Sequence, residues 1–154
     1  MSDKPQLTHV DEDGRASMVD VGGKAETLRT ALASGRVTMS EEAFRLLAAG
    51  EVPKGNVMAA ARIAGIMAAK RTSDLIPLCH PLPISKISVN FTTDRFAEVT
   101  ASGRTGVEME ALTAVSVACL TLYDMLKSAD QTMVIGPVRL ETKTGGARGD
   151  YHRA

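Results

Sequence analysis

Hydrophobic residues recur at helical spacing in three stretches of the chain. The longest covers residues 108–128, and its apolar positions are Leu112, Val115, Cys119, Leu122 and Leu126. A shorter stretch begins after Ser40, a residue type that caps helix N-termini, and ends at Gly50. Between these two, the alanine-rich residues 57–71 predict a long helix. Its many small side chains indicate close packing against another element.

Alternation of apolar and polar residues predicts strands elsewhere. Residues 84–92 alternate in this way, and residues 96–101 are expected to pair back on them as a hairpin. Residues 103–106 are expected to form a loop. A further strand is predicted over residues 133–142, with Pro137 inside it.

Two segments have a less regular pattern. Residues 24–39 suit either a helix or a strand, and Ala31, Ala33 and residues 37–39 favour a strand for the second half. Residues 76–83 contain three prolines. Because proline fixes its own φ and pushes the preceding residue to an extended conformation, this segment is predicted to be neither helix nor regular strand.

From residue 37 onward the predicted order is strand, helices, strand, strand, helix, strand. This βαββαβ order is typical of a ferredoxin-like α+β sandwich, in which an antiparallel sheet packs on helices. The sequence contains no internal repeat and no sign of a second domain. We expect a flexible or partner-bound arm over residues 1–17, a single ferredoxin-like domain over residues 18–144, and a glycine-rich tail over residues 145–154.

A length of 154 residues suffices for one domain whose core needs no disulfide or metal. The two cysteines, Cys79 and Cys119, cannot build a disulfide framework. Scarce aromatic residues (3%) and a formal net charge of zero argue against a nucleic-acid-binding surface. The chain opens on polar residues, and no uninterrupted apolar run approaches the ~18 residues of a membrane span. We therefore expect a soluble cytoplasmic protein that binds neither nucleic acid nor membrane.

The basic and acidic residues that give this net charge of zero are unevenly distributed along the chain. Residues 53–93 hold five basic residues and one acidic residue, and residues 133–154 hold four basic and two acidic residues. These basic segments can focus an anionic ligand if the fold brings them together. The candidate anion contacts are Lys54-Gly55, Lys70-Arg71 and Lys143 before Gly145-Gly146. Neither GxxxxGK[ST] nor GxGxxG is present, so the sequence has no familiar nucleotide-binding loop.

Cys79 and His80 lie inside the proline-rich segment. Prolines on both sides would hold the His80 imidazole in a fixed direction, as acid–base chemistry requires. A hydrogen-bonded histidine in a structural turn fits the sequence equally well. Cys79 suits a small buried residue better than a thiolate nucleophile, because no base is identifiable beside it. Zinc-ligand spacings are absent.

Carboxylates occur near both ends of the longest predicted helix. Glu108 and Glu110 stand in its first turn, where they complement the helix dipole and where at least one could face a pocket. Asp124 and Lys127 are three residues apart and can form an ion pair. Such pairs are commonplace on surfaces. If the pair is partly desolvated, the pKa of Lys127 falls and the two residues can act as a general acid–base couple.

Several long strings taken together resemble the cyclic pyranopterin monophosphate synthase family, the C protein of molybdenum cofactor biosynthesis. These strings are Leu75–Leu82 (LIPLCHPL), Gly106–Thr113 (GVEMEALT), Tyr123–Met125 with Lys127, and Ile135–Leu140 (IGPVRL). The resemblance extends to residues 7–9, 18–21 and 61–66, so it spans almost the whole chain in order.

The resemblance implies a ferredoxin-like enzyme, a phosphorus–oxygen lyase. Its substrate is 3′,8-cyclo-7,8-dihydroguanosine 5′-triphosphate, which a radical enzyme makes from GTP. The family rearranges this substrate to cyclic pyranopterin monophosphate and releases pyrophosphate. The resemblance also implies a homohexamer, a trimer of dimers, with sites near the dimer interface. No redox cofactor is required, and Mg²⁺ can accompany the triphosphate or pyrophosphate without a dedicated protein cage.

By the same resemblance, Asp124 and Lys127 match the active-site pair of the family, with the aspartate as the usual catalytic residue. The remaining matches are substrate-binding or pocket residues, namely Leu78, Cys79, His80, Met109, Glu110, Glu108, Lys54, Lys143 and Arg29.

The sequence departs from the family pattern in two places. Asn56 stands where the family commonly has Asp, and Ala147-Arg148 stands where it commonly has Lys-Ser. These changes bear on the phosphate contacts and leave the reaction class unchanged. The alternative hypothesis is a non-catalytic ferredoxin-like module that binds a nucleotide or takes part in assembly, because this fold hosts both kinds of function.

Overall fold

The structure is a computed structural model, and it describes residue 15 and residues 28–94, 98–105, 107–146 and 149–154. Within these residues the strands are β1 (Thr30–Thr38), β2 (Ser88–Thr93), β3 (Glu98–Thr105), β4 (Val134–Ile135), β5 (Arg139–Thr144) and β6 (Tyr151–His152). The helices are α1 (Glu41–Ala49), α2 (Val57–Ala69), α3 (Thr72–Leu75) and α4 (Glu108–Leu126). Most of the arm expected over residues 1–17 lies outside the described residues.

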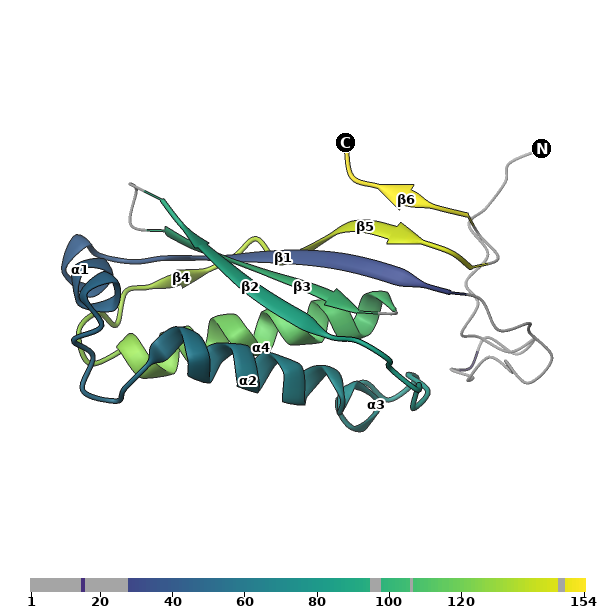
Figure 1. Ribbon diagram of the computed structural model, residues 1–154, viewed down its shortest axis with the longest axis horizontal. Coiled ribbons are helices and arrows are strands. Elements are labelled where there is room, and N and C mark those ends of the chain that lie inside the picture. The colour runs from purple at the N-terminus through teal and green to yellow at the C-terminus, as the bar shows by residue number, and fades with distance from the viewer. Residues whose placement is uncertain (1–14, 16–27, 95–97, 106, 147–148) are drawn as a thin grey trace.

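The strands form one antiparallel sheet in the order β2-β3-β1-β5-β6, and β4 pairs with one end of β1. Helices α2 and α4 lie together on one face of this sheet (Figure 1). The βαββαβ order with β1 and β3 in the centre is the ferredoxin-like arrangement, so the α+β prediction is confirmed.

The longer helices form where the hydrophobic pattern predicts them. At the start of α1 the Ser40 hydroxyl accepts a hydrogen bond from Ala43 N at 3.2 Å, and Gly50 ends the helix with a φ of 69°. Helix α2 ends at Ala69, before the expected residue 71, because the chain tightens into a turn in which Arg71 N bonds to Ala68 O. The short helix α3 was not predicted.

Three strand predictions need correction. Residues 103–105 belong to β3 rather than to a loop, because Gly103 lies between Ala33 and Val89 of its two neighbouring strands. Pairing on both sides overrides the low strand preference of glycine. Only Ser88–Thr93 of the strand expected from residue 84 is formed. Ser88 lies opposite Arg104, next to the last residue of β3, so earlier residues have almost no strand to pair with.

The strand expected over residues 133–142 is divided into β4 and β5. The break falls at Gly136–Pro137, a cis peptide bond. Proline has no N–H group to donate to a ladder, which accounts for the interruption. The tail beyond residue 145 adds β6, whose two residues pair with Thr142 and Lys143 of β5.

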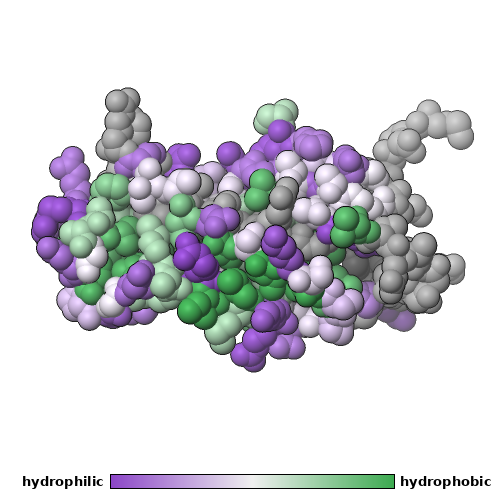
Figure 2. All heavy atoms as spheres, viewed as in Figure 1, coloured by the Kyte–Doolittle hydropathy of each residue, from purple (hydrophilic) through white to green (hydrophobic). Residues whose placement is uncertain are grey.

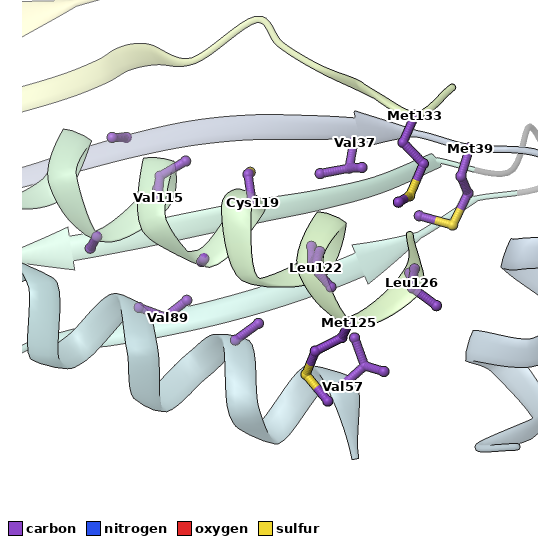
Figure 3. Packing of buried hydrophobic residues seen from close by; sticks show 14 of the residues in the cluster. Val37, Met39, Val57, Val89, Val115, Cys119, Leu122, Met125, Leu126 and Met133 are labelled. Atoms are coloured by element: carbon purple, nitrogen blue, oxygen red, sulfur yellow. The ribbon is translucent and has the colours of Figure 1, made fainter. Parts of the chain in front are cut away.

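The core lies between the sheet and the two long helices. Figure 3 shows Val115 and Cys119 on the side of α4 that faces the strands, and Val57 and Met125 where α2 meets α4. Helix α4 is long and apolar enough to cross a membrane by length and composition, but 56% of its apolar window is buried inside the fold. A core helix has the same composition.

Small residues bring α2 and α4 together. Ala61, Ala114 and Ala118 are buried at this contact, and Gly65 faces α4. A Cβ atom added to Gly65 would lie 2.7 Å from the main-chain oxygen of Ala114 and 3.2 Å from a methyl group of Val89. The backbones of the two helices are therefore as close as a residue without a side chain allows.

We expect Gly65→Ala to lower the free energy of unfolding by about 1–3 kcal/mol, because the new methyl group overpacks a rigid contact. Alanine is intrinsically the better helix former by about 1 kcal/mol, so a site with free space would show the opposite sign. Urea denaturation at one fixed protein concentration measures the difference. An unchanged or higher stability would contradict the close contact between the helices.

Candidate active site

The residues singled out from the sequence form two groups at opposite ends of α4. Asp124 and Lys127 lie at its C-terminal end together with Lys54, and Glu108 and Glu110 lie in its first turn. Asp124 follows Glu110 by fourteen positions, which correspond to about 21 Å of helix. One chain therefore does not gather all of these side chains around one point.

The C-terminal group consists of one carboxylate between two lysines. Lys127 Nζ lies 2.7 Å from Asp124 Oδ1, and Lys54 Nζ lies 3.4 Å from Asp124 Oδ2. Lys54 Nζ also donates a 2.8 Å hydrogen bond to the main-chain oxygen of Asp124, which lies in the last turn of α4. This geometry leaves one net positive charge on the cluster.

A turn before α2 delivers Lys54 to this position. Gly55 N bonds to Val52 O at 3.0 Å, and Gly55 has a φ of 91°, which suits glycine. The next residue, Asn56, is the N-cap of α2, and its side-chain oxygen accepts a hydrogen bond from Ala59 N at 3.0 Å. Aspartate caps helices equally well, so the capping role survives the departure at position 56. The second departure, Ala147-Arg148, lies outside the described residues.

The ion pair stays charged in the single chain. Hydrogen bonds from Lys127 and Lys54 lower the pKa of Asp124, and the hydrogen bond to Asp124 raises the pKa of Lys127. The side chains of Asp124 and Lys127 are 58% and 52% exposed. The condition for a lowered Lys127 pKa, partial desolvation, is thus not met by one chain alone.

The second group includes another lysine–carboxylate pair. Lys143 Nζ of β5 donates a 2.7 Å hydrogen bond to Glu108 Oε1, and both side chains are mostly buried. Burial alone would raise the pKa of Glu108, but the hydrogen bond from Lys143 and the charges of Lys143 and Arg29 lower it. Arg29, just before β1, is therefore close enough to act on this carboxylate.

Glu110 has the opposite environment. It is 3% exposed, and its Oε2 atom has no hydrogen-bond partner among the described residues. Burial raises its pKa, and the negative charge of Glu108 raises it further. Glu110 lines a hollow of about 50 Å³ between α4, the end of α2 and the proline-rich segment.

The proline-rich segment places its residues beside this carboxyl. His80 lines the hollow with Pro81 and Leu82, while Leu78 is half-buried close by in the chain. Cys79 is half-buried, and its N–H group bonds to Ile76 O at 3.0 Å. Burial and the charges of Glu110 and Glu108 raise the pKa of the Cys79 thiol, so it remains protonated, as expected for a residue that is not a nucleophile.

Met109, which the family resemblance names as substrate-binding, is half-buried and lies between the two glutamates in the chain. The structure also adds residues to this group that the sequence did not assign to it. Lys70, predicted only as one of several anion contacts, lines the hollow together with Thr72 and Ser73. No signal in the sequence distinguishes Ser73, because its role follows from where α3 packs against α4.

Comparison with known proteins covers almost the full chain. A family model described as "MoaC family" matches residues 18–146. A protein of Parvibaculum lavamentivorans is 57% identical over 153 residues, covering 95% of this chain and 96% of its own length. A protein of Roseiflexus sp. is 58% identical (94% of this chain, 96% of its own length), and one of Heliobacterium modesticaldum is 55% identical (96% and 97%). All three carry the name cyclic pyranopterin monophosphate synthase.

The two glutamates of the first turn should affect stability with opposite signs. Folding lowers the pKa of Glu108 below its usual value near 4.5, so this carboxylate stabilises the folded protein at higher pH. Glu108→Gln should therefore lower the melting temperature at pH 7. The difference from the wild type should disappear as the pH falls through the lowered pKa. Folding raises the pKa of Glu110, so ionisation of this carboxyl destabilises the folded protein as the pH rises through the raised pKa. Glu110→Gln should therefore raise the melting temperature at pH 7 and leave it unchanged below about pH 4.5.

Melting curves of the two variants and the wild type between pH 4 and pH 8 measure this contrast, and each variant serves as the other's control. Shifts of the same sign in both variants at pH 7 would show that the two carboxyls do not differ in environment.

Proposed function

The chain belongs to the MoaC family, and from this premise we propose that it converts 3′,8-cyclo-7,8-dihydroguanosine 5′-triphosphate to cyclic pyranopterin monophosphate with release of pyrophosphate. It is a lyase of molybdenum cofactor biosynthesis. The observation that carries the proposal beyond the family is the Asp124 carboxylate held between Lys127 and Lys54. Single ion pairs are commonplace on surfaces, but a carboxylate shared by two lysines from different segments also provides the groups that proton transfer beside a phosphate needs.

The C-terminal group suits the chemistry of this reaction. The rearrangement needs proton transfers at carbon and nitrogen, and it needs a ribose hydroxyl to attack the α-phosphate while pyrophosphate leaves. A lysine–aspartate pair can hold and move a proton. The second lysine supplies the positive charge that stabilises the negative charge developing on phosphate oxygens. Lys54 and Lys127 therefore have complementary roles in the proposal.

The reaction transfers no net electrons, so the proposal includes no redox cofactor. Mg²⁺ is expected to enter with the triphosphate or to leave with pyrophosphate. In the described part of the chain, no group of three or more His, Cys, Asp and Glu side chains could hold a metal ion. The upstream partner is a radical enzyme that cyclises GTP.

We further propose that each site is completed by a second copy of the chain. The two groups are about 21 Å apart, and the hollow beside Glu110 is far smaller than the ~300 Å³ of a small-molecule site. Between the two groups the outer surface of α2 and α4 is apolar. Ile63, Met67 and Leu120 are 59%, 56% and 57% exposed there. Figure 2 shows hydrophobic residues gathered over α2.

A two-fold axis across this apolar surface would bring the two groups together. Val117 is midway between Glu110 and Asp124 on α4. An axis through this point, perpendicular to the helix, places Asp124 of one chain beside Glu110 of the partner subunit and generates two identical sites. Burial at such an interface would also desolvate the Asp124–Lys127 pair. Three such dimers would give the homohexamer that the family resemblance implies.

Lys127→Ala should abolish formation of cyclic pyranopterin monophosphate, with kcat/KM at least about 10²-fold lower, and should leave the oligomer intact. Lys86→Ala, at an exposed lysine outside both groups, is the control and should react like the wild type. Product is measured chromatographically, and oligomer mass by light scattering. Turnover by Lys127→Ala at the wild-type rate would remove this lysine from the mechanism.

Sharing of sites between subunits is tested by mixing inactive variants. In a dimer of one Lys127→Ala chain and one His80→Ala chain, one site carries both changes and the other carries neither. Random mixing of equal amounts should therefore restore about a quarter of the wild-type activity. A mixture of Lys127→Ala and Asp124→Ala should restore none, because both residues belong to the same group. If the first mixture is as inactive as the second, each site belongs to a single chain.

A further inference from the structure

The turn that follows α4 (residues 127–132) begins with Lys127 and is anchored to the fold by a buried carboxylate. Asp130 is 7% exposed, and it accepts hydrogen bonds from Ser40 N at 2.7 Å and from Thr132 N at 2.8 Å. Ser40 is the N-cap of α1, so these bonds tie the turn to the start of another helix. Hydrogen bonds to a charged group are the stronger kind, which makes Asp130 the main anchor of this turn.

A second contact closes the same turn from its outer side. The hydroxyl of Tyr123, in the last turn of α4, donates a 3.0 Å hydrogen bond to the main-chain oxygen of Gln131. Tyr123 is half-buried and Gln131 is exposed, so water can replace either partner of this bond. Because such a bond adds little to the free energy of unfolding, its loss should change the local geometry more than the stability. The proposed reaction assigns no role to Tyr123.

Tyr123 is a close neighbour of Lys127. Lys127 follows Tyr123 by four positions and Asp124 by three, and around the helix axis it falls between them. Lys127 N donates a 2.9 Å hydrogen bond to Tyr123 O, so the lysine is held to the last helical turn. Tyr123 is also one of the groups that raise the pKa of Lys127, which places the phenol near the ammonium group. The stem of Lys127 therefore lies between an aromatic ring and the carboxylate with which it pairs.

We propose that Tyr123 is a positioning residue that holds Lys127 on Asp124. The bond to Gln131 fixes the phenol against the turn, and the fixed ring removes the rotamers in which the lysine stem swings away from the aspartate. Lys127 is 52% exposed, and an exposed lysine loses much side-chain entropy when it is held in one geometry, so a pre-set path for its stem favours the pair. The inference rests on the proposed function, in which Lys127 and Asp124 move a proton as a pair.

Tyr123→Phe tests this role, because it keeps the ring and removes only the hydroxyl. With the cyclised substrate we expect kcat per folded oligomer to fall about tenfold, since a misplaced acid–base pair transfers protons slowly. KM should stay within about twofold of the wild-type value, because the hydroxyl binds the turn rather than the substrate. Light scattering and melting curves should show an intact oligomer of nearly unchanged stability.

The matched control is Tyr151→Phe, which removes the hydroxyl of the only other tyrosine in the sequence. Tyr151 lies in β6 and is 41% exposed. This variant should keep the kcat and the KM of the wild type.

Crystal structures of the wild type and of Tyr123→Phe give a readout that does not depend on activity. In the variant the distance from Lys127 Nζ to the Asp124 carboxylate should lengthen beyond about 4 Å, the usual limit of an ion pair. The bonds of Asp130 to Ser40 and Thr132 should persist, because they do not involve the phenol.

Three outcomes would overturn the inference. The first is a Tyr123→Phe variant with the kcat of the wild type. The second is a variant whose main change is a higher KM, which would place the phenol on the substrate. The third is a lower kcat with the pair of Lys127 and Asp124 unchanged in the crystal. A wild type that forms no product would contradict the proposed reaction instead, and the two crystal structures would then still decide the role of Tyr123.

Discussion

The contact between α2 and α4 is the constraint on which the rest of the structure depends. Gly65 on α2 allows the two backbones to approach closely, and alanines fill the remaining space. The two helices run in opposite directions, so each end of α2 fixes a different part of the candidate site. The turn before α2 carries Lys54 to the end of α4, and the chain after α2 carries Lys70 and His80 to its beginning. A shift of one helix along the other would displace both groups together.

The electrostatics follow from the same packing. Glu108 and Glu110 are two residues apart, yet their surroundings differ. Glu108 accepts a hydrogen bond from Lys143 of β5, whereas Glu110 lies beside polar and apolar residues of α2, α3 and the proline-rich segment. Side chains two residues apart on a helix point in directions about 200° apart, so the two carboxyls can have different surroundings. This difference gives Glu108 a lysine partner and leaves Glu110 Oε2 without a hydrogen-bond partner among the described residues.

The sequence predicted the helices well, because their hydrophobic periodicity, Ser40 cap and Gly50 stop act locally. Strand ends were less predictable, since Gly103 and residues 84–87 depend on where neighbouring strands begin and end. The ion pair of Asp124 and Lys127 follows from helical spacing, but its exposure and its contact with Lys54 depend on tertiary structure. The separation of the two groups could not be inferred from residue types. This separation depends on how α4 is oriented relative to the segments that precede it, which is a feature of the tertiary structure.

The central position of β1 has a consequence for the order in which the protein can fold during synthesis. This strand ends at Thr38, but its partners β3 and β5 begin only at Glu98 and Arg139, so they are made much later. Lys143, the partner of Glu108, arrives with β5. Local helices can form early, whereas the sheet must wait for distant strands. The nascent chain therefore exposes the apolar face of β1 until these later strands have been made, and neither the complete sheet nor the first-turn group exists before β5.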